Sequence, residues 1–173
     1  MTSTRKLTYS ALFLSFGVIL PQIFHLFGGT GPIFLPMHIP VLLAGFFLGA
    51  PFGAAVGILS PLLSSALTGM PQFPILLFMI GELAAYGFFA GYFYKHRKLN
   101  IYVSLIGAMI LGRVVMALVI YVLQFALGLQ IQPLAYVITA IAAGLPGIAI
   151  QFIFLPPMVR LLHRAARYDH PEP

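Results

Sequence analysis

The sequence is poor in charge and lacks two residue types altogether. Its 173 residues include no cysteine, no tryptophan and only three acidic residues, and 7% of them are charged. The absence of cysteine excludes disulfides, thiolate catalysis and cysteine-bound metals. A hydrophobic content of 61%, arranged in apolar runs of about 20 residues, excludes a soluble domain. The sequence therefore predicts an all-α integral membrane protein, with one transmembrane domain over residues 1–173.

Motifs for catalysis and for ATP hydrolysis are also missing. The sequence contains no Gly-x-x-x-x-Gly-Lys-Ser/Thr phosphate loop, so the chain is not expected to hydrolyse ATP by itself. It contains no His-Glu-x-x-His or Gly-x-Ser-x-Gly motif and no cluster of carboxylates. We therefore expect no enzyme activity, no metal site and no cofactor. A solute that this chain moves would need energy supplied by partner proteins.

Glycine and proline residues divide the hydrophobic sequence into six predicted spans. The spans cover approximately residues 7–27, 33–48, 52–67, 73–94, 101–127 and 134–162. The second and third are short for a hydrocarbon core about 30 Å thick, and Pro36, Pro40 and Pro61 lie within them. Such spans are tolerated where they tilt, or where an irregular backbone lines a cavity enclosed by protein. We expect a compact bundle of six transmembrane helices.

The basic residues indicate how the bundle is oriented. Six spans place eight of the nine Lys and Arg residues on one side of the membrane: Arg5, Lys6, Lys95, Arg97, Lys98, Arg160, Arg164 and Arg167. The loops predicted on the other side, near residues 28–35, 68–72 and 128–133, contain none. The positive-inside rule makes the basic side cytoplasmic, so both termini are expected in the cytoplasm. The net charge of +6 thus reflects topology rather than a nucleic-acid partner.

Glu82 and Arg113 are the charged residues that lie deep within predicted spans. Helical rise places Glu82 about 14 Å, and Arg113 about 12 Å, from the outer boundary of a core about 30 Å thick. A charge at such depth costs roughly 2.5 to 3.5 kcal/mol on insertion scales. Two interpretations remain open: a salt bridge that ties two helices together, or a binding site in which at least one group faces a cavity.

Helical spacing adds polar neighbours to this pair. Arg113 shares a predicted face with Tyr121 and Gln124, and Glu82 shares one with Tyr86. Other polar residues have plainer explanations beside the functional one: Ser64 belongs to a stripe of small residues suited to helix packing, and His38 lies where an interfacial histidine is common. The candidate site comprises Arg113, Glu82, Gln124, Tyr121, His38, Ser64 and Tyr86.

Ala11 and Ser15 form a small-xxx-small pair on the first span. Small residues at this spacing permit the close approach of another helix. Spacing alone leaves open whether that helix belongs to this chain or to a second protein.

Several stretches resemble a known family. They are residues 35–49 (LPMHIPVLLAGFFLG), 82–87 (ELAAYG), Gly112 with Arg113, and 144–151 (GLPGIAIQ). With six spans and a small-xxx-small first helix, the chain resembles the S components, the substrate-binding subunits of energy-coupling factor (ECF) vitamin transporters. The last three stretches resemble the branch associated with pantothenate.

The resemblance implies a function and a set of partners. Members of the family bind a vitamin near the outer face, under the loop between the first two spans, here residues 24–35. Their first helix docks on a transmembrane coupling subunit (EcfT) that rests on two ATPases, and hydrolysis topples the S component in the plasma membrane of a prokaryote. Ala11 and Ser15 match the docking pattern, with Ser in place of the commoner Ala.

Pantothenate would match the candidate residues. Its carboxylate suits Arg113, while Glu82 would orient Arg113 or accept a hydroxyl proton. Gln124, Tyr121, Ser64 and His38 could serve its neutral polar groups. Folate, thiamine, riboflavin, pyridoxine and queuosine precursors remain open. So do two other classes: a self-contained oligomeric carrier or channel for a small anionic metabolite, and a membrane assembly protein without a ligand.

Overall fold

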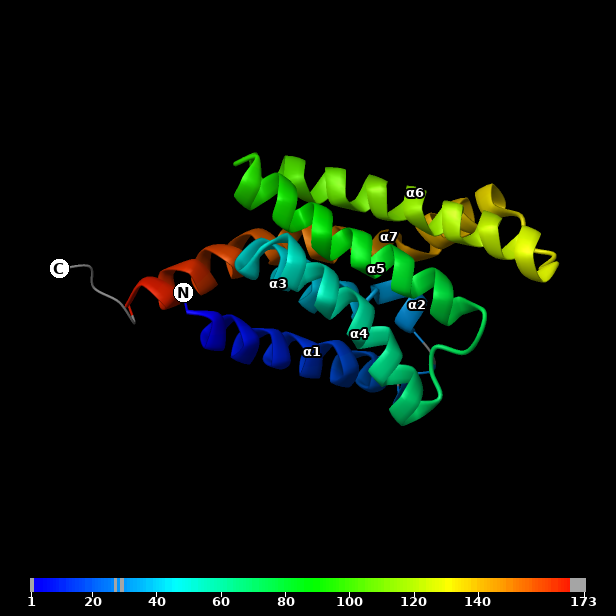
Figure 1. Ribbon diagram of the computed structural model, residues 1–173, viewed down its shortest axis with the longest axis horizontal. Helices are drawn as coiled ribbons and strands as arrows, with labels where there is room; N and C mark the ends of the chain where they lie inside the picture. Colours follow the sequence, from blue (N-terminus) through cyan, green and yellow to red (C-terminus); the bar gives the residue numbers. More distant parts are fainter. Residues whose placement is uncertain (1, 27, 29, 169–173) are drawn as a thin grey trace.

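The protein is an all-helical bundle. The computed structural model describes residues 2–26, 28 and 30–168, without the side chains of residues 167 and 168. No strand occurs in these residues, which confirms the predicted fold class. The helices are α1 (Ser3–Leu26), α2 (Gly31–Phe34), α3 (His38–Leu48), α4 (Ala50–Thr68), α5 (Ile75–Gly91), the π-helical η1 (Tyr92–His96), α6 (Ile101–Leu127) and α7 (Pro133–Tyr168) (Figure 1).

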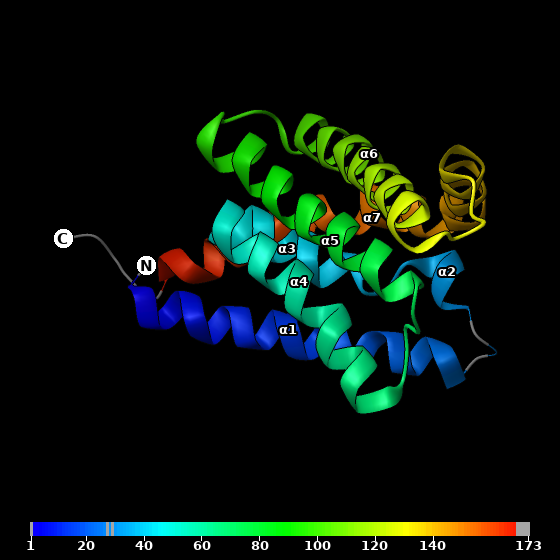
Figure 2. The same ribbon diagram turned by 45° about the vertical axis from the view of Figure 1, so that its right-hand side comes forward.

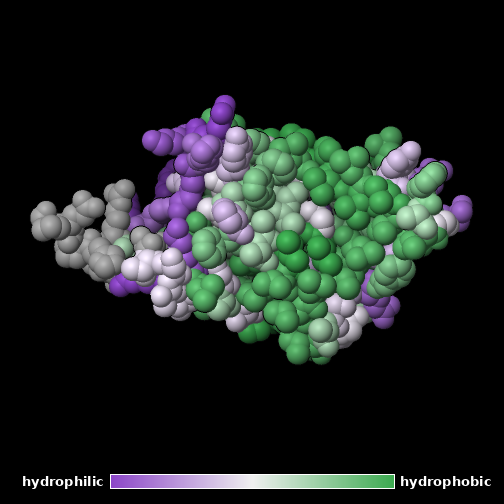
Figure 3. Space-filling model, in the orientation of Figure 1, coloured by the Kyte–Doolittle hydropathy of each residue, from purple (hydrophilic) through white to green (hydrophobic). Residues whose placement is uncertain are grey.

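Six helical segments are long and apolar enough to cross a membrane: α1, α2 with α3, α4, α5 with η1, α6, and α7. The surface agrees with this composition. A hydrophobic belt covers the middle of the visible face, and hydrophilic residues gather toward its ends (Figure 3). Large apolar side chains such as Phe125, which is 90% exposed, face outward. Lipid is the solvent that such a belt requires, and the chain is a multi-pass membrane protein, as predicted.

The two ends of the bundle differ in charge. Helix α1 begins, and α7 ends, at the same end of the bundle (Figure 1). Lys95 in η1 and the connection from η1 to α6, which contains Arg97 and Lys98, lie at this end as well. We call it the basic end. Helix α1 ends and α2 begins at the opposite end, where the connections from α4 to α5 and from α6 to α7 also lie, as the six-span prediction requires (Figures 1 and 2).

Helix α3 and helix α5 form the centre of the bundle. Helix α5 packs against α3, α4 and α6, whereas α1 packs against α3 and α4. In both ribbon views α1 and α6 lie on opposite sides of the bundle, with α3, α4 and α5 between them (Figures 1 and 2). Almost every residue of α3 is buried, including Phe46 and Phe47. A helix that is apolar on all faces belongs at such a central position.

Glycines allow α3, α4 and α5 to approach closely. A Cβ atom added at Gly53 or Gly57 on α4 would collide with the backbone of Gly87 or Leu83 on α5. One added at Gly45 on α3 would also collide with the Gly87 backbone. Small residues at a helix contact let backbones pack together in lipid, where no hydrophobic force drives association. Gly53 and Gly57 share a predicted face of α4 with Ser64, so the packing interpretation of this stripe of small residues is confirmed at these two glycines.

A break separates α2 from α3 inside the second span. Leu35 has a left-handed backbone (φ 50°), an unusual conformation for a leucine, and Pro36 follows it. The α2 segment packs against α7, where a Cβ at Gly147 would collide with the Phe34 backbone. Irregular backbone at membrane depth is stable only where protein or a cavity surrounds it. The break therefore indicates a cavity beside it.

Candidate functional site

A cavity of about 410 Å³ lies in the half of the bundle opposite the basic end. Its lining comes from the carboxyl-terminal turns of α1 and α4, from α2, the break after it and the start of α3, from the connection before α5, from the first half of α5, from α6, and from the first half of α7. Pocket volumes for small ligands fall between about 300 and 1,000 Å³. The cavity is thus suited to a small molecule and lies at the end that the basic residues predict to be outside.

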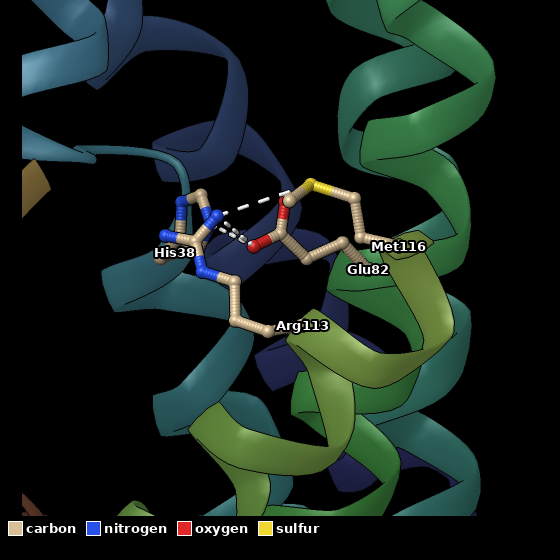
Figure 4. A network of polar contacts seen from close by, with 4 residues as sticks. All are labelled: His38, Glu82, Arg113 and Met116. Carbon is tan, nitrogen blue, oxygen red and sulfur yellow. Dashed lines mark hydrogen bonds and ion pairs between the residues drawn. The ribbon is translucent and has the colours of Figure 1, made fainter. Parts of the chain in front are cut away.

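The deep wall of the cavity carries an ion pair. Arg113 Nη1 on α6 lies 2.7 Å from Glu82 Oε1 on α5, and the two side chains are only 10% and 4% exposed (Figure 4). The pair confirms that these residues lie at the same depth on adjacent antiparallel helices. Both residues also line the cavity. The two interpretations left open by the sequence are therefore compatible, because the salt bridge itself forms part of the cavity wall.

His38 joins this pair from the first turn of α3. Its Nε2 lies 3.6 Å from Glu82 Oε1, the same oxygen that contacts Arg113. Figure 4 shows the three side chains converging from three helices, with Met116 beside the guanidinium. Arg113 Nη1 also lies 3.9 Å from the Met116 sulfur, a weak acceptor. We call His38, Glu82 and Arg113 the polar triad.

The triad has unused hydrogen-bonding capacity. Arg113 Nη2 and both ring nitrogens of His38 are buried and have no hydrogen-bond partner among the described residues. An unsatisfied buried polar group costs about 1 to 3 kcal/mol. A ligand with acceptor and donor groups would satisfy these atoms. Their position on a cavity wall gives them the arrangement of a binding site.

Apolar and flexible side chains form most of the remaining wall. The non-polar lining residues include Leu35, Met37, Met70, Ile75, Phe78, Met79, Met116 and several prolines. Methionine adapts its shape to different neighbours. The cavity therefore has a mostly apolar wall of adaptable shape, with the polar triad on its deep side.

Tyr86 packs against His38, a member of the polar triad. Its ring lies 5.1 Å from the His38 ring at an interplanar angle of 69°, and a Cβ added at Gly112 would meet the same tyrosine ring at 3.2 Å. Tyr86 is buried and does not line the cavity. The structure therefore places it in contact with a triad member rather than with the cavity.

Ser64 lines the cavity, but its hydroxyl is already engaged. Ser64 Oγ donates a hydrogen bond of 2.8 Å to the carbonyl oxygen of Met70 in the α4–α5 connection. Thr68 Oγ1 bonds the Ser64 carbonyl at 2.7 Å. The bond to Met70 ties the α4–α5 connection, which lines the cavity, to α4, so Ser64 shapes the wall.

Tyr121 and Gln124 lie away from the cavity. Tyr121 is 63% exposed on the outside of α6, and neither residue lines the cavity. At about 100° per residue, Tyr121 is rotated by about 80° from Arg113, and Gln124 lies about 16 Å farther along the axis. The inward face instead continues from Arg113 through Met116 and Ile120, both buried. The grouping of these two residues with Arg113 is therefore not reproduced in the structure.

Some residues that line the cavity were not predicted from the sequence. His25 at the end of α1, Gln72 before α5 and Tyr136 on α7 lie around the mouth. Tyr136 stacks edge-on against Phe78 with a centroid distance of 5.4 Å. The spacing of Tyr136 with Ala140 and Ala143 could have indicated an inward face of α7. No group of three or more potential metal ligands occurs in the described part of the chain.

The first helix presents Ala11 and Ser15 to the outside. Ala11 and Ser15 are exposed, whereas Phe13, Gly17 and Pro21 face the bundle. Ser15 Oγ donates to the Ala11 carbonyl at 2.9 Å, so its hydroxyl is satisfied within the helix. No other described helix of this chain covers this face. It is available for a second protein or for lipid.

A known protein family matches most of the chain. The family described as "ECF transporter, substrate-specific component" matches residues 5–159, which covers all six spans at least in part. The chain belongs to this family. Searches of curated proteins and of solved structures returned no match. The cavity described above is thus the candidate substrate site of an S component.

Proposed function

We propose that this S component captures a water-soluble vitamin for an ECF importer in the plasma membrane of a prokaryote, and that the vitamin is pantothenate. The observation that carries the proposal is the polar triad in the cavity wall, where Arg113 has a free donor beside an apolar chamber. A carboxylate fits a guanidinium nitrogen through a charge-assisted bond. The hydroxyl and amide groups of pantothenate can donate to Glu82 and to the mouth residues.

Cavity size supports a small cargo. A volume of about 410 Å³ is near the lower end of the range for ligand pockets. Pantothenate is a short linear molecule whose two methyl groups suit the methionine-rich wall. A large macrocyclic cofactor exceeds this space.

The topology that we propose places the cavity outside and the basic end in the cytoplasm. The basic residues at one end follow the positive-inside rule, and the cavity lies toward the other end. We further propose that the exposed face with Ala11 and Ser15 docks on EcfT, which rests on two ATPases. The S component itself then has no enzymatic role, and toppling on its partners delivers the vitamin.

A panel of vitamins in a thermal-shift assay tests the cargo. A ligand that binds only the folded state stabilises it by an amount that grows with its concentration above Kd. We expect the purified chain to gain stability with pantothenate and not with thiamine, riboflavin or folate. Stabilisation by a different vitamin would identify that vitamin as the cargo in place of pantothenate. No stabilisation by any vitamin would favour an assembly protein.

A further inference from the structure

Because the triad is buried, its charges must balance when a ligand binds. The opposite charges of Glu82 and Arg113 cancel each other. We propose that an anionic ligand enters this cavity together with one proton, which His38 accepts. This inference rests on the proposed function, because it concerns the same site and an anionic cargo.

The need for the proton follows from burial. Both members of the ion pair are at least 90% buried, and His38 is 4% exposed. A ligand carboxylate at Arg113 would leave the site with a net negative charge. An uncompensated ion in a protein interior is strongly unfavourable. A proton from solvent restores neutrality without any further protein charge.

His38 is placed to hold that proton. Its Nε2 lies 3.6 Å from Glu82 Oε1, so an imidazolium would pair with Glu82 while Arg113 turns Nη2 to the ligand. The Tyr86 ring, at 5.1 Å, lies within the distance at which an aromatic ring attracts a cation. Neither nitrogen of His38 has another partner among the described residues.

The remaining ionisable groups around His38 do not offer the same place for the proton. Helix α5 contributes Glu82 and Tyr86, α6 contributes Arg113, α7 contributes Tyr136, and α1 contributes His25. Helices α2 and α4 contain no ionisable side chain. Arg113 stays charged and a tyrosine holds its proton at neutral pH, while His25 is an exposed residue at the mouth. Glu82 is the counter-ion of Arg113 at 2.7 Å, and His38 Nε2, at 3.6 Å from the same oxygen, is the remaining basic nitrogen beside that carboxylate.

The need for charge balance determines which ligands bind and with how many protons. A monocarboxylate binds with one proton, and a ligand without net charge binds with none. A dicarboxylate such as folate leaves one charge unbalanced and is rejected. Because the bound state holds more protons, affinity for the monocarboxylate falls as pH rises, by up to about tenfold per pH unit.

Calorimetry in two buffers of different ionisation enthalpy measures the proton directly. Pantothenate is titrated into the detergent-solubilised chain from about pH 6 to about pH 8.5, the range in which histidine titrates. The alcohol analogue pantothenol, which lacks the carboxylate, is the matched ligand. We expect uptake that approaches one proton per pantothenate at its maximum and no uptake with pantothenol.

Two variants locate the proton. His38→Gln is expected to abolish the uptake and to flatten the pH dependence of Kd, whereas His96→Gln, at an exposed histidine of the basic end outside the cavity, keeps both. Pantothenate binding without proton uptake, or equal uptake with pantothenol, overturns the inference and leaves the proposed function intact. Uptake that persists in His38→Gln overturns the assignment to His38. The wild-type comparison of the two ligands decides the proton linkage even if His38→Gln does not fold.

Discussion

Replacing Arg113 by alanine separates ligand binding from structural pairing. The side chain has two terminal nitrogens: Nη1 contacts Glu82 at 2.7 Å, and Nη2 has no partner among the described residues. A hydrogen bond to a charged group contributes about 1.5 to 3 kcal/mol. If Nη2 binds the vitamin carboxylate, Arg113→Ala weakens Kd by roughly 10- to 150-fold.

The same substitution also destabilises the fold, and a second variant corrects for this. Removing one partner of a buried ion pair costs about 3 to 5 kcal/mol, because the other charge is left uncompensated. The double variant Glu82→Gln/Arg113→Ala removes that charge. We expect it to regain much of the lost thermal stability and to bind pantothenate no better than Arg113→Ala does.

Calorimetry measures Kd for each variant, and thermal unfolding without ligand measures stability. Arg97→Ala is the matched control, because Arg97 is an exposed arginine at the basic end. Wild-type affinity in both Arg113 variants would refute the reasoning. Arg113 would then serve only to pair with Glu82, and the carboxylate would bind elsewhere.

Three further predictions concern docking, packing and topology. Ala11→Trp places a bulky ring on the exposed small face and is expected to abolish uptake by the assembled transporter while vitamin binding persists; lost binding would place this face in the fold. Gly57→Ala is expected to lower stability by about 1 to 3 kcal/mol through overpacking, whereas Gly31→Ala, whose Cβ meets only a ring carbon at 3.9 Å, changes little in thermal unfolding. The chain lacks cysteine, so Lys98→Cys should react with impermeant maleimide only from the cytoplasm and Gln130→Cys only from outside; the reverse pattern would invert the topology.

The helices could be predicted from the sequence because membrane spans follow from local composition. Six apolar runs, separated by glycine, proline and charge, correspond to the six helical segments in the structure. The depth of Glu82 and Arg113 followed from helical rise, which accumulates little error over ten residues. The sequence could therefore predict that Glu82 and Arg113 lie level enough to pair.

The rest of the site depends on how helices rotate and break. His38 reaches Glu82 because the second span breaks at Leu35, and spacing does not reveal the direction of the chain after such a break. Tyr121 was grouped with Arg113 by a spacing of four, but two such steps drift by about 80° from a face. Tyr136 enters the cavity because α7 packs against α2 and α6, and long-range contacts of this kind leave little local trace.

Uptake of radiolabelled pantothenate into proteoliposomes tests the central claim most directly. The chain is reconstituted alone, or together with EcfT and both ATPases, and binding and ATP-dependent accumulation are measured in parallel. The account predicts that the chain alone binds pantothenate without accumulating it, and that accumulation requires the partners and ATP. Accumulation by the chain alone would contradict the account and identify a self-contained carrier.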